Sequence, residues 1–151
     1  RVLEALYPDP PFLFTVDPYG EKPYPTGDHD KNEYIYGSDF YLQSKRLLAP
    51  FPNHAHFLMT GEDFVEGVVN RNYWHRGEHK VITDFSLVFI DGDHSAQTVL
   101  RTLRGLEPHM LRTCVVVVDN ADWDGAFNRD LAGRNLDLKL YTGRTAVLQR
   151  V

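Results

Sequence analysis

The stretch that decides the fold is Phe85–Ile90, FSLVFI, which is followed directly by Asp91. A short, nearly continuous apolar run of this kind is typical of a strand buried on both faces of a parallel sheet. The apolar spacing over Ser95–Leu111 then predicts an amphipathic helix. Cys114–Val118 predicts a second buried strand, and an acid, Asp119, again follows it. This strand–helix–strand order indicates an α/β sheet with parallel neighbours.

Segments on both sides of this unit continue the alternation. Upstream, we expect a helix end over 1–7, a strand over 12–16, a long polar and aromatic loop over 18–37, a helix over 38–49, a strand over 56–59, a helix over 63–70 and an exposed polar insertion over 71–83. Downstream, we expect a short helix over 124–132 and strands over 136–141 and 145–151, joined by a Thr142-Gly143-Arg144 hairpin turn. The pattern predicts a doubly wound, Rossmann-like, mostly parallel sheet in three α/β/α layers, ending in an antiparallel hairpin.

Length and composition narrow the class of protein. The chain has 151 residues, which suits one domain, 1–151. Its lone cysteine, Cys114, excludes an internal disulfide and a zinc site made of several thiolates. A formal net charge of −5 argues against general nucleic-acid binding. No apolar run approaches the roughly 20 residues of a membrane helix, so we expect no membrane partner and a reduced, cytoplasmic setting.

Acidic residues follow each of the four predicted parallel strands. The strand ends carry Asp17, the run Gly61-Glu62-Asp63, Asp91 and the pair Asp119-Asn120. One such acid is often only a turn or helix-cap residue. Because ligands bind beyond the carboxyl ends of strands in open α/β sheets, four acids at one edge indicate a binding site.

The segment from Phe85 through Asp91-Gly-Asp-His94-Ser, together with VVVVDNADWDG over 115–125, resembles class I S-adenosylmethionine-dependent methyltransferases. It looks closest to small-molecule O-methyltransferases of the catechol, caffeoyl-CoA and macrolide-sugar type, a family-24-like group. The predicted terminal hairpin is also similar. The resemblance covers about 12–151, and its specific part is 85–125. The resemblance implies that the partner is a small-molecule acceptor. It also suggests a homodimer.

The resemblance implies a metal site and a base. Metal-dependent members carry an Asp after the fourth strand and an Asp-Asn pair after the fifth, which here are Asp91, Asp119 and Asn120. These oxygen ligands suit Mg²⁺. A base three residues after the first ligand is often lysine in relatives, and here it is His94. The alternatives are that the two acids are strand-end caps in a metal-free relative, that His94 only starts a helix, and that His29 is the base.

The resemblance also implies a cofactor site. The acid after the second strand binds the ribose hydroxyls of S-adenosylmethionine, and Asp17 fits that place. In the family, residues after the third strand lie near the adenine; here they are Gly61, Glu62, Asp63 and Phe64. Asp91 is a further candidate for cofactor binding. Phe64 as helix core is the alternative. Three roles remain for Asp93: a helix cap, a substrate contact or an outer partner of the metal. Two remain for Trp123: a wall of the acceptor pocket or a buried packing residue.

One part of the family pattern has no counterpart. The first strand and its glycine-rich turn should precede the helix end expected over 1–7, but the first glycine is Gly20. We therefore expect a domain that is incomplete at its N-terminus and lacks the first strand of the family sheet. The leading function is metal-assisted O-methylation of a small phenolic or sugar-type acceptor, with the 18–37 loop as its lid. The alternative is a methyltransferase-like binding module that has lost the cofactor.

A metal-dependent hydrolase is a third reading of the same acids. It would use Asp91, Asp93, His94 and Asp119 around one ion. A single histidine is fewer than hydrolytic metal sites usually use, so we favour the methyltransferase and the binding module over a hydrolase.

Overall fold

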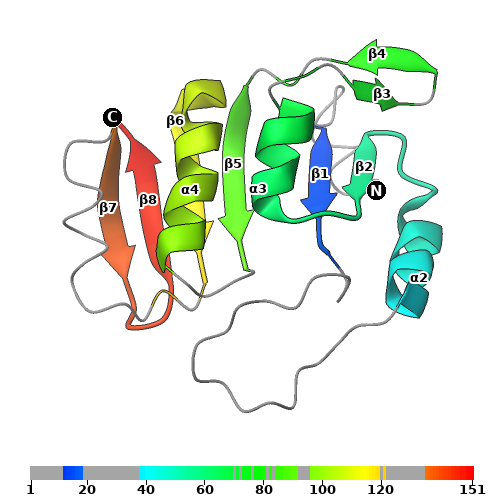
Figure 1. The fold of residues 1–151 in the computed structure, drawn as a ribbon. Helices are drawn as coiled ribbons and strands as arrows, with labels where there is room; N and C mark the ends of the chain where they lie inside the picture. The colour runs from blue at the N-terminus through cyan, green and yellow to red at the C-terminus, as the bar shows by residue number, and fades with distance from the viewer. Residues whose placement is uncertain are drawn as a thin grey trace.

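The computed structural model describes residues 12–18, 38–69, 71, 73–75, 77–80, 82, 84–91, 96–119, 121 and 135–151. In chain order the elements are β1 (Leu13–Val16), α2 (Ser38–Leu48), β2 (His54–Phe57), α3 (Gly61–Phe64), a π-helical turn η1 (Val65–Val69), β3 (Tyr73–His75), β4 (Glu78–Lys80), β5 (Phe85–Ile90), α4 (Ala96–Leu106), a 3-10 turn η2 (Glu107–His109), β6 (Met110–Val118), β7 (Leu136–Tyr141) and β8 (Ala146–Arg150). The chain is thus a mixed α/β structure (Figure 1). The helices expected over 1–7 and 124–132, and nearly all of the 18–37 loop, lie outside the described residues.

The strands pair in three groups over the described residues. β1 and β2 are parallel, β3 and β4 are antiparallel, and the largest group has the order β5-β6-β8-β7. β5 and β6 are parallel, as their sequences predicted, and β8 is antiparallel to both β6 and β7. Gly143, with a φ of 86°, turns the predicted β7–β8 hairpin. Over the described residues the sheet is mixed, so the expectation of a mostly parallel sheet is too simple.

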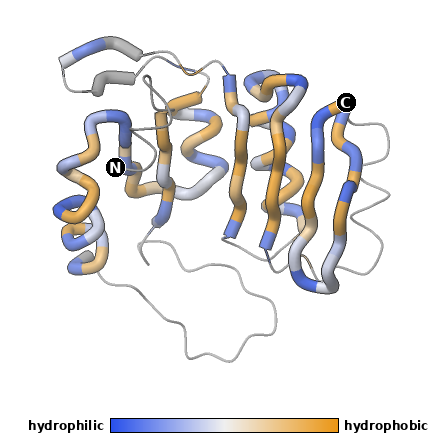
Figure 2. The backbone as a smooth tube through the Cα atoms, turned by 180° about the vertical axis from the view of Figure 1, so that it is seen from behind, coloured by the Kyte–Doolittle hydropathy of each residue, from blue (hydrophilic) through white to orange (hydrophobic). Residues whose placement is uncertain are grey.

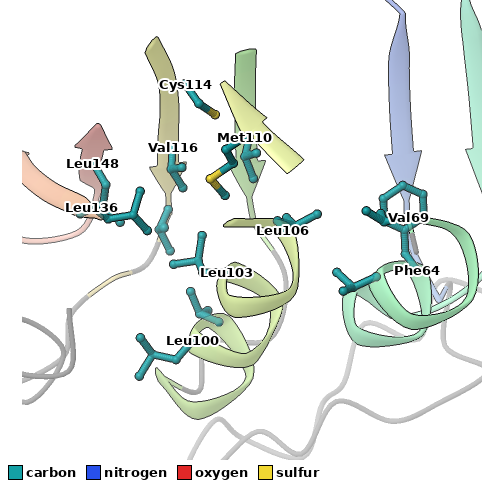
Figure 3. Close-up of a cluster of buried hydrophobic side chains, with 14 of the residues drawn as sticks. Phe64, Val69, Leu100, Leu103, Leu106, Met110, Cys114, Val116, Leu136 and Leu148 are labelled. Atoms are coloured by element: carbon teal, nitrogen blue, oxygen red, sulfur yellow. The ribbon is translucent and has the colours of Figure 1, made fainter. Parts of the chain in front are cut away.

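The hydrophobic core joins α4 to the four-stranded sheet. The face of α4 that carries Val99, Leu100, Leu103 and Leu106 is buried, and Leu103 is only 1% exposed. Figure 3 shows Leu100, Leu103 and Leu106 on α4 beside the side chains of Met110 and Val116 from β6. The spacing of three to four residues places these leucines on one stripe of the helix. Burial of that stripe is what holds α4 against the sheet.

The β1–β2 pair shares this core through aromatic contacts. The ring of Phe14 in β1 lies 6.1 Å from that of Phe85 in β5 and 6.0 Å from that of Phe64 in α3. Phe57 in β2 lies 5.2 Å from Phe64, ring centroid to centroid. β1 and β5 are not hydrogen-bonded neighbours in the described structure. The two sheets are therefore joined by side-chain packing.

Several expected boundaries need correction. β2 begins at His54 and not at 56, because the strand carries polar histidines that an apolar pattern does not count. α3 begins at Gly61 because the Thr60 hydroxyl accepts a hydrogen bond from the Asp63 amide. α4 ends at Leu106, since Pro108 lies in the following turn and β6 begins already at Met110. The 71–83 stretch contains the β3–β4 pair, with Gly77 at a φ of 82° between the strands.

The described helices α3 and α4 lie on the same face of the sheet (Figure 1). On the opposite face Leu87 and Phe89 of β5 are 62% and 61% exposed. Figure 2, a view from behind, shows the apolar strands of that face with no described helix across them. Among the described residues, a helix meets this second face only at the β1–β2 pair, where Tyr41 of α2 stacks on His56. A full second helical layer is not present in the described part of the chain.

Candidate functional site

The carboxyl ends of the parallel strands meet at one edge, as the sequence predicts. Ile90 and Val118 are register partners, and the Asp119 amide donates to the Ile90 carbonyl at 2.9 Å. Asp91 and Asp119 therefore leave adjacent strands side by side. β1 runs in the same direction as β5 (Figure 1), so Asp17 leaves its strand at the same edge. Asp91 is exposed, whereas Asp119 is partly buried.

Asp119 is held by a residue that the sequence analysis did not single out. The Thr145 hydroxyl donates a hydrogen bond of 2.9 Å to Asp119 Oδ1. The Ala121 amide donates to the carbonyl of Arg144, next in the chain to Thr145. These two bonds join the β7–β8 turn to the end of β6. The available signal was a threonine directly after the hairpin turn, on a strand expected to pair near a strand-end acid.

The structure describes only some of the residues of the metal centre that the resemblance implies. Across the described part of the chain, no group of three or more His, Cys, Asp or Glu side chains is arranged to hold a metal ion. Asp91 and Asp119 belong to that part. The other residues assigned to this centre or its surroundings lie outside it: His29, Asp93, His94, Asn120 and Trp123. The described structure thus brings together two of the three expected ligands.

Asp17 occupies the place expected of a ribose-binding acid. It directly follows β1, and its amide donates to the Phe57 carbonyl at 3.1 Å, which continues the β1–β2 ladder by one bond. The side chain is partly buried. A carboxylate fixed by an extended backbone at a strand end suits a nucleoside, because its oxygens can accept hydrogen bonds from both ribose hydroxyls.

The residues after β2 make contacts with α4 in addition to any role beside the adenine. A Cβ placed on Gly61 would lie 3.3 Å from the Thr102 hydroxyl oxygen of α4, so this glycine permits a close approach of the two helices. Glu62 forms an ion pair of 3.6 Å with Arg101, also on α4. Asp63 is exposed. The first turn of α3 therefore packs on α4 as well as standing at the strand edge.

Phe64 lies in the hydrophobic core. Its side chain is 5% exposed and is surrounded by the rings of Phe14 and Phe57. A ring in this position fills the space between α3 and the β1–β2 pair. Its burial favours the packing alternative over a role in covering the adenine.

Beside Asp17 lies a second cluster that the sequence analysis did not find. The Thr15 hydroxyl oxygen is 2.8 Å from His54 Nε2 and 2.6 Å from His56 Nδ1. The His56 ring stacks on Tyr41 of α2 at 5.4 Å between centroids. Burial lowers the pKa of His56, and Lys45 lowers it further, while the negative charge of Asp17 acts in the opposite direction. The signal was the alternation His-Ala-His opposite a threonine two residues before an acid.

Solved structures with this architecture include two methyltransferases. CalS11, a calicheamicin methyltransferase, superposes with a TM-score of 0.62 and 13% identity over 91% of this chain. The O-methyltransferase NovP gives 0.57 and 12% over 93%. The chain has the fold of these methyltransferases. A protein from Corynebacterium glutamicum is similar as well, at a TM-score of 0.56 and 15% identity over 93% of the chain.

The likeness is one of fold and not of sequence. The chain spans about three fifths of the length of these structures, 60% of CalS11 and NovP and 61% of the Corynebacterium protein. No protein-family model matches this sequence, and no curated protein sequence matches it either. Within the described ranges, no helix has the length and apolar character needed to cross a membrane.

Proposed function

We propose that this chain is the core of an S-adenosylmethionine-dependent O-methyltransferase that acts on a small hydroxylated acceptor of phenolic or sugar type. One observation carries the proposal. In a fold shared with two methyltransferases, parallel strands deliver Asp17, Asp91 and Asp119 to one edge of the sheet. That edge is where open α/β sheets bind their ligands.

The cofactor side of the site would be built around Asp17. Its carboxylate would accept hydrogen bonds from the ribose hydroxyls, and the backbone of Gly61–Asp63 would border the adenine. The position and partial burial of Asp17 fit this role. S-adenosylmethionine supplies an electrophilic methyl group on a sulfonium. The protein's main contribution is then to hold the acceptor oxygen in line with that methyl group.

The acceptor side would be built around Asp91, Asp119 and Asn120. Their oxygen atoms fit Mg²⁺, which would bind the acceptor oxygens and lower the pKa of the hydroxyl. Thr145 keeps the Asp119 carboxylate oriented. His94 would accept the hydroxyl proton as the acceptor oxygen takes the methyl group from the sulfonium, which would leave S-adenosylhomocysteine.

Calorimetry and a methyl-transfer assay on the full-length protein test the proposal. We expect S-adenosylmethionine to bind, and Asp17→Asn to weaken binding by at least tenfold. With a panel of catechols and sugars, Asp119→Ala should abolish any turnover that Mg²⁺ stimulates and EDTA removes. Asp137→Asn, an exposed acid on β7 far from the proposed site, is the matched control and should behave as wild type. Turnover that survives both EDTA and Asp119→Ala would exclude the metal role.

A non-catalytic methyltransferase-like module is the second candidate. The observation that favours it is that two of the four residues expected beside the adenine serve packing: Glu62 pairs with Arg101, and Phe64 lies in the core. This candidate predicts that neither S-adenosylmethionine nor S-adenosylhomocysteine gives measurable heat. Binding of either compound would exclude it.

A further inference from the structure

The polar face of the β1–β2 pair is organised around a single hydroxyl. Residues that alternate along a strand point to the same face, so Thr15 and Asp17 share one face of β1. His54 and His56 lie on the matching face of β2, because His56 is the register partner of Thr15. The two imidazole rings stack with 6.0 Å between centroids, and the Thr15 oxygen is within hydrogen-bond distance of both. The arrangement is a hydroxyl-bridged histidine pair.

The bridge restricts the protons that the pair can hold. A threonine hydroxyl carries one proton, so it can donate to only one of the two ring nitrogens. The other imidazole must donate its own N–H to the Thr15 oxygen. If both rings were protonated, both would donate to one oxygen and two positive charges would stack at 6.0 Å. His54 is only 7% exposed, and its Nε2 lies against the Thr15 oxygen.

The charged and titratable groups around His56 come from all three packed elements. β2 contributes His54, and Asp17, which directly follows β1, carries a negative charge that favours the protonated ring. From α2, Tyr41 stacks on the ring, and Lys45 disfavours protonation. Lys45 Nζ itself lies 5.7 Å from the centre of the Tyr41 ring. Among the described residues, Asp17 thus attracts a proton on His56 and Lys45 opposes it.

We propose that His56 is a positioning residue for Asp17, and that a proton on the bridged pair withdraws Asp17 from the ribose of a nucleoside cofactor. The inference rests on the proposed function, because it assigns the ribose hydroxyls to Asp17. With His56 neutral, the Asp17 carboxylate accepts from the hydroxyls. With His56 protonated, the carboxylate is drawn to the imidazolium, and the cofactor competes with that charge. Cofactor binding and proton binding then oppose each other, and the opposition is reciprocal.

Calorimetric titration with S-adenosylhomocysteine from pH 5.5 to 8 tests the cofactor side of the inference. In wild type we expect Kd to rise as the pH falls below about 6.5, by up to about tenfold per pH unit for one linked proton. His56→Asn places an amide near the position of Nδ1 but cannot titrate, so Kd should lose this rise. Thr15→Ser keeps the hydroxyl and should keep the wild-type profile, whereas Thr15→Val should not. His109→Asn, in the η2 turn that precedes β6, is the matched control and should keep the profile.

An NMR titration of His56 tests the coupling without any cofactor. Asp17→Asn should lower the pKa of His56, because it removes the favourable negative charge. An unchanged His56 titration in Asp17→Asn, or a wild-type Kd profile in His56→Asn, would overturn the inference. Loss of stability alone would shift the thermal midpoint and leave the shape of the Kd profile intact, which separates positioning from folding. If wild type binds no S-adenosylhomocysteine at any pH, the proposed function and the inference both fail.

Discussion

The two halves of the molecule differ in the strand faces that α4 and α2 cover. Where α4 covers the four-stranded sheet, the side chains beneath it are apolar and fully buried: Cys114, Val116, Val118 and Leu148 are all 0% exposed. Where α2 meets the β1–β2 pair, the strand face carries Thr15, His54 and His56. Two α2 leucines are exposed there, Leu42 at 49% and Leu47 at 68%. The first region is built for burial, and the second for hydrogen bonds beside Asp17.

The largest effect that this contrast predicts is on stability in the buried half. Leu148→Ala in β8 removes a side chain that is 0% exposed, and it should lower the free energy of unfolding by about 2–5 kcal/mol. Leu47→Ala in α2 is the matched control. Because Leu47 is 68% exposed, its change should stay within about 0.5 kcal/mol. Chemical denaturation of both variants measures the difference, and equal losses would contradict the contrast.

The packing of α4 gives the next largest effect. A Cβ on Gly105 would collide with Val65 Cγ1 of η1, so Gly105→Ala forces the helix and the turn apart. The overpacking should cost about 1–3 kcal/mol, more than the roughly 1 kcal/mol that alanine gains over glycine inside a helix.

Gly67→Ala is the control for Gly105→Ala. A Cβ on Gly67 in η1 meets nothing within 4 Å, so this substitution should be neutral or stabilising. Thermal unfolding of the two variants separates them. A stabilised Gly105→Ala would mean that α4 and η1 are not in contact in solution.

The same contrast explains which elements the sequence could predict. Phe85–Ile90 and Leu136–Tyr141 agree with the expected bounds, and α2 ends one residue earlier than expected. Apolar runs and turn residues define these segments. β2 was placed two residues late, because His54 and His56 are strand residues whose burial depends on a threonine from another strand. A tertiary hydrogen bond leaves no periodic trace in the sequence.

The sequence predicted the acids at the strand ends of the candidate site, but not the residues that hold those acids in place. The expected edge position of Asp91 and Asp119 is confirmed, because parallel strands of known direction fix where their ends meet. Thr145, which lies 26 residues along the chain from Asp119, was not found. Phe64 was assigned two roles, and only packing distinguished them. The metal, base and cofactor assignments stay predictions.

Thr145 offers a smaller test at the edge of the buried half. Thr145→Val removes the hydroxyl that donates to Asp119 Oδ1, and the free energy of unfolding should fall by about 1 kcal/mol, with up to about 3 kcal/mol if the carboxylate is left without compensation. Thr145→Ser keeps the donor and should recover most of the loss. Denaturant unfolding of the three proteins measures this. A valine variant as stable as the serine variant would show that the bond contributes nothing to folding.

The smallest effect, on pH dependence, belongs to the β1–β2 half. Burial lowers the pKa of His56 in the folded chain below its ordinary value of about 6.5, so the unfolded chain binds the proton more tightly. The stability that comes from neutral His56 is therefore complete above about pH 7. It is lost as the pH falls through 6.5 towards the lower folded pKa. Unfolding measured from pH 8 to 5 should show this decline in wild type and a shallower one in His56→Asn. Leu148→Ala should keep the wild-type pH dependence of the free energy of unfolding, because it changes burial alone. A shallower pH dependence in Leu148→Ala would show that the two halves are not independent.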